Sequence, residues 1–223
     1  MKLSLYDCTR PFAAVGLRFL CRYEYIDRKQ KLPDGPIIVV SNHLSWFDIP
    51  LIGLAIPRQI AFMAKKEYFH SPFHRRLVDL YGGFTVERGA VDGTALRTAF
   101  NVLEEGRCLG IFPEGTRAKS LQLQQGHVGT AFIALHTNAY ILPIGVSGTE
   151  KIRDKFQGIT HIFYRPKVTV NIGKPYKLPD VHGHPSRKDR DRSTDIIMRS
   201  IAELLPESYR GVYRDNASAD KKD

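Results

Sequence analysis

The sequence has few cysteines, and this shortage excludes two classes of protein. Its three cysteines, Cys8, Cys21 and Cys108, form no C-x-x-C pair and no zinc-ligand spacing, so neither a disulfide framework nor a zinc module is indicated. Cys108 lies in an apolar run, which predicts a small core residue rather than a reactive thiol. An odd number of cysteines, with no recognisable secretory signal, favours a reducing compartment.

Long hydrophobic runs are also missing. A membrane-spanning helix needs ~18–20 uninterrupted apolar residues, and the best candidate, residues 49–64, is interrupted by Pro50, Pro57 and Arg58. We therefore expect neither a transmembrane helix nor a signal peptide.

The N-terminal segment, residues 1–24, has its own pattern. Phe12, Val15 and Phe19 recur at helical spacing, with several arginines nearby. This pattern fits a short amphipathic helix lying peripherally on the cytoplasmic side of a membrane, and it equally fits a helix packed on the rest of the domain. The sequence leaves both interpretations open.

Positive charge is abundant. There are 33 Lys and Arg against 23 Asp and Glu in 223 residues, giving a formal net charge of +10. Such a balance points to anionic partners, namely phosphorylated substrates, acidic lipid surfaces or nucleic acid. A basic surface that serves only solubility explains the same number.

Short apolar runs alternate with segments of helical pattern. Nearly continuous hydrophobic runs, typical of strands in a parallel sheet, predict strands at 36–40, 59–64, 82–86, 107–112, 139–146 and 167–173. Helices are expected at 73–81, 93–106, 127–137 and 193–205. The alternation predicts an α/β fold, a single domain with a largely parallel central sheet flanked by helices. We expect this domain to cover residues 25–206, with a charged connector at 180–192 and a polar tail at 207–223.

The stretch "SNHLSWFDIP" holds a candidate for acid–base chemistry. Two residues separate His43 from the end of an expected strand, and Asp48 opens the next helix. In α/β sheets, active residues gather where strands end. The carboxylate can fix one imidazole nitrogen, which leaves the other free to act as a general base. Alternatively, Asp48 serves only as a helix-entry carboxylate near the positive end of the helix dipole.

Two further stretches, "GGFTVERG" and "FPEGTR", place Arg88 and Arg117 beside glycine-containing turns. A guanidinium binds phosphate through paired hydrogen bonds, so these arginines are candidates for a phosphate clamp. They are equally explained as surface residues that pair with neighbouring carboxylates. A fourth stretch, "LPIGVSG", contains Pro143, which suggests an edge strand or a bulge.

In this order, the four stretches resemble the glycerolipid acyltransferase family, specifically the bacterial 1-acylglycerol-3-phosphate acyltransferases. The residues that match are Asn42, His43 and Asp48 in the first block, Gly83, Phe84 and Arg88 in the second, Phe112–Arg117 in the third and Pro143 in the fourth.

The resemblance implies transfer of a fatty acyl group from acyl-CoA or acyl carrier protein to the sn-2 hydroxyl of 1-acylglycerol 3-phosphate. His43 would be the general base and Asp48 its support, with no acyl-enzyme, metal or tightly bound cofactor. The acceptor phosphate site would comprise Arg88, Glu114, Gly115, Thr116 and Arg117, with Glu114 orienting its neighbours. Anionic lipid and the membrane surface would be the partners, and nucleic acid would not.

One departure concerns the acceptor. Many relatives carry lysines after the third block, whereas this chain has "LQLQQGHVG", with His127 in that segment. Glycerol 3-phosphate, a lysophospholipid or a lipid outside the glycerol series therefore stay open as acceptors.

Two other classes of protein fit parts of the sequence. The stretch "GVSGT" approaches the G-x-S-x-G motif of serine hydrolases, with Ser147 as nucleophile, but Thr149 replaces the final glycine. A nucleic-acid-binding module would explain the charge, yet no recognised module is visible.

Overall fold

The computed structural model describes residues 5–65, 84–86, 93–118, 120–156, 164–181 and 183–214. Within these residues seven strands form one sheet in the order β1-β7-β6-β2-β5-β3-β4. Strands β6, β2, β5, β3 and β4 run parallel, whereas β7 pairs antiparallel with β6 and β1 follows the direction of β7. The strand bounds are Arg22–Ile26 (β1), Ile37–Ser41 (β2), Ile60–Lys65 (β3), Phe84–Val86 (β4), Cys108–Ile111 (β5), Tyr140–Ser147 (β6) and Lys167–Ile172 (β7).

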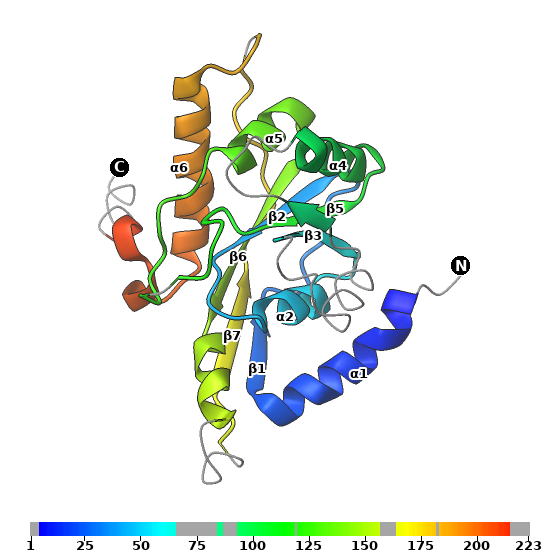
Figure 1. The fold of residues 1–223 in the computed structure, drawn as a ribbon, viewed down its shortest axis with the longest axis vertical. Coiled ribbons are helices and arrows are strands. Elements are labelled where there is room, and N and C mark those ends of the chain that lie inside the picture. The colour runs from blue at the N-terminus through cyan, green and yellow to red at the C-terminus, as the bar shows by residue number, and fades with distance from the viewer. Residues whose placement is uncertain are drawn as a thin grey trace.

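Helices cover both faces of this sheet (Figure 1). Successive residues of a strand point to opposite faces, so Ile38 and Val40 of β2 join a core beneath α4, α5 and α6, while Ile37 and Val39 join a second core beneath α1 and α2. A central strand must therefore be apolar throughout. The helix bounds are Leu5–Leu20 (α1), Asp48–Ala55 (α2), Gly93–Glu104 (α4), Gly129–Thr137 (α5) and Arg187–Glu203 (α6), with 3₁₀ segments at Thr149–Phe156 (η2), Glu207–Tyr209 (η4) and Gly211–Tyr213 (η5).

The predicted α/β class and all six predicted strands are confirmed, each within a few residues. Cys108 is fully buried, as expected of a small core residue. The expected helix at 73–81 lies outside the described residues, as do the end of the chain from residue 215, Gly83 and Arg88.

The sequence-based boundaries were wrong in three places. Strand β1 was missed, because the alternating, half-exposed pattern of "RYEYI" lacks the continuous apolar run of the other strands. Helix α6 begins at Arg187, inside the expected connector, because Ser186 and Asp189 form a reciprocal capping box. The start of the expected polar tail, residues 207–213, instead forms two 3₁₀ segments, and Tyr213 is buried.

Pro143 was expected in an edge strand or bulge, yet it lies in β6, an interior strand. The pairing of β6 with β7 ends at Ile144, and only an isolated bridge at Ile141 continues it. Pro143 sits between these two points, where a missing N–H is tolerated. Its carbonyl still accepts a hydrogen bond from Gly173 N at 2.9 Å. A Cβ on Gly173 would lie 2.8 Å from the proline ring, so glycine permits the close approach.

Helix α2, which begins with Asp48, is apolar all round and buried beneath α1. Its last carbonyls have no partner within the helix, and side chains of neighbouring elements supply donors instead. Tyr6 binds Gly53 O at 2.9 Å, while Arg10 and Arg28 both bind Leu54 O, at 3.1 and 2.9 Å. These bonds fix α2, and with it the position of Asp48.

Candidate active site

The candidate residues meet at one edge of the sheet. Strands β2, β5 and β6 are parallel neighbours, so their carboxyl ends lie side by side. His43 follows β2 by two residues, Glu114 follows β5 by three and Thr149 follows β6 by two. This edge is where ligands bind in open α/β sheets.

His43 and Asp48 form the predicted pair. Nδ1 of His43 lies 2.8 Å from Asp48 Oδ2, which assigns the ring proton to Nδ1 and leaves Nε2 to exchange protons. The imidazole stacks on Phe112, with 4.0 Å between ring centroids and 15° between planes. The carboxylate is fully buried, whereas 14% of the imidazole side chain is exposed. The carboxylate is therefore held inside the protein, while part of the imidazole is accessible from solvent.

Asp48 does more than open its helix. Its Oδ2 also accepts hydrogen bonds from the backbone N–H groups of Leu44, at 2.7 Å, and Ser45, at 2.8 Å. The carboxylate thus closes the turn that carries His43. The alternative role, a carboxylate near the helix dipole, is compatible with this geometry because Asp48 occupies the first turn of α2.

Thr149 is the remaining hydrogen-bond donor to Asp48. It was not among the site residues predicted from sequence. Its hydroxyl donates to Asp48 Oδ1 at 2.6 Å, across 101 residues of chain. Thr149 is the residue that departs from the serine-hydrolase motif, and its side chain is fully buried. Ser147, the nucleophile of that alternative, ends β6 with its backbone paired to Thr169 of β7.

Asn42 joins β2 to β6 beyond the end of their ladder. Its amide donates to Val146 O and accepts from Val146 N, both at 2.8 Å. The side chain therefore mimics a strand neighbour and is itself buried. Because His43 follows Asn42 and Thr149 lies three residues beyond Val146, this bond holds the two partners of Asp48 at a fixed separation.

Glu114 links two backbone segments instead of facing solvent. Its Oε1 accepts from His43 N at 3.0 Å and its Oε2 from Gln124 N at 2.9 Å. Desolvation by burial raises the pKa of the carboxyl to about 7, although the two backbone donors act in the opposite direction; the charge of Asp48 raises it further. The side chain is 2% exposed. The carboxylate of Glu114 therefore joins the backbone at His43 to the backbone at Gln124.

Gly115 turns the chain toward Arg117. It has φ of +64°, a left-handed conformation that favours glycine. A Cβ there would also lie 2.9 Å from the imidazole Cδ2 of His127. Helix α5 begins at Gly129 and not at His127 as expected, so the histidine lies in the preceding loop against this turn.

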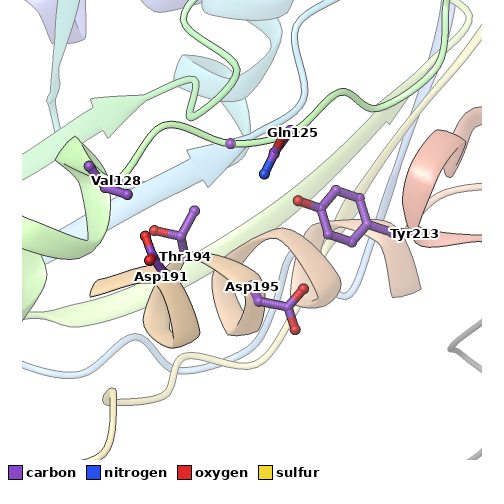
Figure 2. A pocket seen from close by; sticks show the side chains of 7 residues that line it. Gln125, Val128, Asp191, Thr194, Asp195 and Tyr213 are labelled. Carbon is purple, nitrogen blue, oxygen red and sulfur yellow. The ribbon is translucent and has the colours of Figure 1, made fainter. Parts of the chain in front are cut away.

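The loop that supplies Gln124 N rests on the C-terminal part of the chain. Leu123 N donates to Tyr209 O at 2.8 Å. Next along this loop, Gln125 lines a cavity of about 140 Å³ together with Thr194 and Tyr213, and Asp191 and Asp195 also line it (Figure 2). The cavity is separate from the residues around His43. The described carboxylates that line it pair with Arg187 and Arg199 of the same helix.

Arg117 extends from the turn after Gly115 and is exposed. Its guanidinium carbon lies 5.1 Å from the centroid of the Trp46 ring. Ala118 N, the next backbone donor, binds His43 O at 2.8 Å, which ties this segment to the turn that carries His43. Thr116 is also exposed. Phe84 begins β4, and its side chain, like Arg88, lies outside the described part of the structure.

Together these features define an α/β domain that holds a partly exposed imidazole against a buried carboxylate at the carboxyl edge of its sheet. Comparison with known proteins gives the class. Residues 23–147 match the family model described as Acyltransferase.

The chain is 29% identical, over 79% of its length, to the 1-acyl-sn-glycerol-3-phosphate acyltransferase of Bacillus subtilis, of which it covers 85%. It is 33% identical, over 52% of its length, to the lyso-ornithine lipid O-acyltransferase of Pseudomonas aeruginosa, of which it covers 44%.

Among solved structures, the crystal structure of the 1-acyl-sn-glycerophosphate (LPA) acyltransferase PlsC from Thermotoga maritima superposes with a TM-score of 0.67 at 25% identity, covering 89% of this chain and 79% of that one. The chain belongs to the acyltransferase family, and it is an O-acyltransferase.

Proposed function

We propose that the protein transfers a fatty acyl group from acyl-CoA or acyl carrier protein to the sn-2 hydroxyl of 1-acylglycerol 3-phosphate, giving phosphatidic acid. The observation that carries the proposal is the His43–Asp48 pair at the carboxyl edge of the sheet, with Nδ1 and Oδ2 2.8 Å apart. The Bacillus and Thermotoga relatives bear the names of enzymes that act on this acceptor.

In the proposed mechanism, Nε2 of His43 removes the proton from the acceptor hydroxyl as its oxygen attacks the thioester carbonyl. The tetrahedral intermediate collapses with cleavage of the C–S bond, and the departing thiolate takes the proton back from Nε2. Asp48 holds the Nδ1 proton throughout and stabilises the imidazolium. The steps balance without a metal or an acyl-enzyme.

The acceptor phosphate would be bound by Arg117 and Arg88, with Gly115 and Thr116 shaping the turn and Glu114 orienting it. Support comes from the exposure of Arg117 and Thr116 on the segment bonded to His43 O through Ala118 N. A phosphate contact made equally in the ground and transition states affects KM more than kcat. We expect Arg117→Ala to raise the acceptor KM at least several-fold and to change kcat little.

The direct test measures thiol release from a long-chain acyl-CoA, with and without 1-acylglycerol 3-phosphate. Wild type should release thiol only with the acceptor, and His43→Ala should release none while remaining folded. Release without acceptor would indicate a thioesterase, which would refute the proposal. If wild type is inactive with acyl-CoA, the same assay with acyl carrier protein thioester decides the donor.

The acceptor itself has one specific alternative. Residues 121–126 contain no lysine, where the family resemblance implies lysines before a glycine, and the Pseudomonas relative is named for lyso-ornithine lipid. Assays that replace 1-acylglycerol 3-phosphate with lyso-ornithine lipid, glycerol 3-phosphate or a lysophospholipid separate these acceptors. If one of these acceptors gives a higher kcat/KM than 1-acylglycerol 3-phosphate, that acceptor replaces it as the proposed substrate.

We further propose that α1 holds the enzyme on an anionic membrane surface. Phe12, Val15 and Phe19 are 79%, 55% and 72% exposed on one side of the helix, whereas Leu17 packs into the core. In the described part of the chain, no helix combines the length and apolarity needed to cross a bilayer. Co-sedimentation with vesicles containing phosphatidylglycerol should fall in Phe12→Ser/Val15→Ser. It should persist in Val212→Ser, which removes an equally exposed apolar side chain from η5.

A further inference from the structure

We propose that Trp46 is a positioning residue that presents the Arg117 guanidinium to the anionic group of the acceptor. The inference rests on the proposed acceptor-binding role of Arg117. It deepens that role by naming the side chain that orients the arginine before substrate arrives.

The first observation is the contact itself. The Arg117 guanidinium carbon lies 5.1 Å from the centre of the Trp46 ring, within the ~6 Å range of a cation–π interaction. Among the described residues, no carboxylate forms an ion pair with Arg117. An ion pair would neutralise the guanidinium and use its N–H groups. An aromatic face orients the cation while its charge and N–H groups remain available to an anion.

The second observation is where the two side chains originate. Trp46 lies inside the turn that Asp48 Oδ2 closes through Leu44 N and Ser45 N. Arg117 immediately precedes Ala118, whose N–H binds His43 O at 2.8 Å. Both partners are therefore anchored to the backbone around His43.

The third observation is that Trp46 is partly accessible, with 38% of its surface exposed, although its ring is large and apolar. An aromatic side chain that is partly exposed and in contact with an arginine fits a role in holding a ligand-binding side chain. It is also the single tryptophan of the chain, so intrinsic tryptophan emission reports on this position alone.

Steady-state kinetics with 1-acylglycerol 3-phosphate test the role. An exposed cation–π contact corresponds to a factor of about two to five in an equilibrium constant, so Trp46→Ala should raise the acceptor KM by about that factor. Trp46→Phe keeps an aromatic face and should restore most of the affinity. In both variants kcat should change less than KM.

A double-mutant cycle distinguishes positioning from a structural role. If Trp46 acts through Arg117, adding Trp46→Ala to Arg117→Ala should leave the acceptor KM unchanged. An equal further rise in KM in the double variant would overturn the inference. The matched control is Lys177→Ala, which removes a similar pair, Lys177 over Tyr140 at 5.0 Å, from the amino end of β6 at the opposite edge of the sheet. It should leave KM unaltered.

Tryptophan emission provides a readout independent of turnover. Titration of wild type with sn-glycerol 3-phosphate, a soluble carrier of the same phosphate, should give a saturable change in emission that Arg117→Ala abolishes. An identical change in Arg117→Ala, or none in wild type at concentrations that inhibit transfer competitively, would refute the positioning role. If instead no acyl transfer occurs with any acceptor while the emission response persists, the proposed reaction fails and the anion site stands.

Discussion

The hydroxyl of Thr149 provides the sharpest test of how the site is held together. Thr149→Val replaces the hydroxyl by a methyl group of similar size and removes the donor to Asp48 Oδ1, at present 2.6 Å away. Asp48 is fully buried, so water does not replace the lost donor without a local rearrangement. A hydrogen bond to a charged group contributes about 1.5–3 kcal/mol. The free energy of unfolding should fall by that amount.

For a domain of this size, ~1 kcal/mol shifts the melting temperature by about 2–4 °C, so Thr149→Val should melt about 3–12 °C lower than wild type. Thr149→Ser retains the hydroxyl and should recover most of that loss. The control is Thr194→Val, which removes a buried hydroxyl whose acceptor is the neutral carbonyl of Arg190, at 2.7 Å. A neutral bond contributes about 0.5–1.5 kcal/mol.

The measurement is calorimetric melting of wild type, Thr149→Val, Thr149→Ser and Thr194→Val, with kcat determined for each. Because Asp48 orients His43, Thr149→Val should lower kcat more than it raises either KM. If Thr149→Val loses no more stability than Thr194→Val, the hydrogen bond from Thr149 to the charged Asp48 contributes no more than a bond to a neutral carbonyl, and the reasoning is refuted. If Thr149→Ser melts as low as Thr149→Val, side-chain packing and not the hydroxyl is responsible.

Two other substitutions examine the turn around Glu114. The buried carboxyl of Glu114 has its pKa raised from 4.5 to about 7, so its protonated form favours folding below about pH 4.5, and this contribution is lost as pH rises through 7. Urea unfolding across this range should show Glu114→Gln least stable relative to wild type at the acid end, the difference shrinking by on the order of 3 kcal/mol toward neutrality; a constant difference would contradict the raised pKa. Gly115→Ala places a Cβ at φ of +64° and 2.9 Å from His127 Cδ2, and should cost at least about 1–2 kcal/mol in thermal unfolding. Gly16→Ala in α1, where a Cβ meets open space, should instead be neutral or stabilising, and equal losses in both would refute the steric argument.

The parts of the site that follow from sequence are those that local spacing determines. His43 and Asp48 are separated by one short turn at the end of an apolar strand, so their proximity was predictable before any tertiary contact was known. The orienting role of Glu114 comes from the resemblance and stays a prediction, whereas its two backbone donors, His43 N and Gln124 N, are known only from the structure. The strands were predictable because burial on both faces demands continuous apolar runs.

The remaining parts depend on contacts between distant segments. Thr149 follows a strand, as His43 does, and this position hints at a site residue. Identifying Thr149 as a partner of Asp48 also required knowing that β6 lies beside β2. Trp46 was visible inside the first motif, yet its contact with Arg117 depends on how two loops fold over that edge. Strand β1 escaped prediction because half-exposed strands carry charged residues that hide the apolar alternation.

The hydrogen bonds that Asp48 accepts explain why the His43–Asp48 pair depends on the whole sheet edge. A buried carboxylate is tolerated only when hydrogen bonds replace its hydration. Three donors reach Asp48 from its own turn, but Thr149 comes from the end of β6. The distance between those two sources is fixed by Asn42, whose amide bonds both backbone groups of Val146. A change that loosens the β2–β6 junction should therefore disturb His43 without touching it, because it removes the fourth donor from the charge that orients the imidazole.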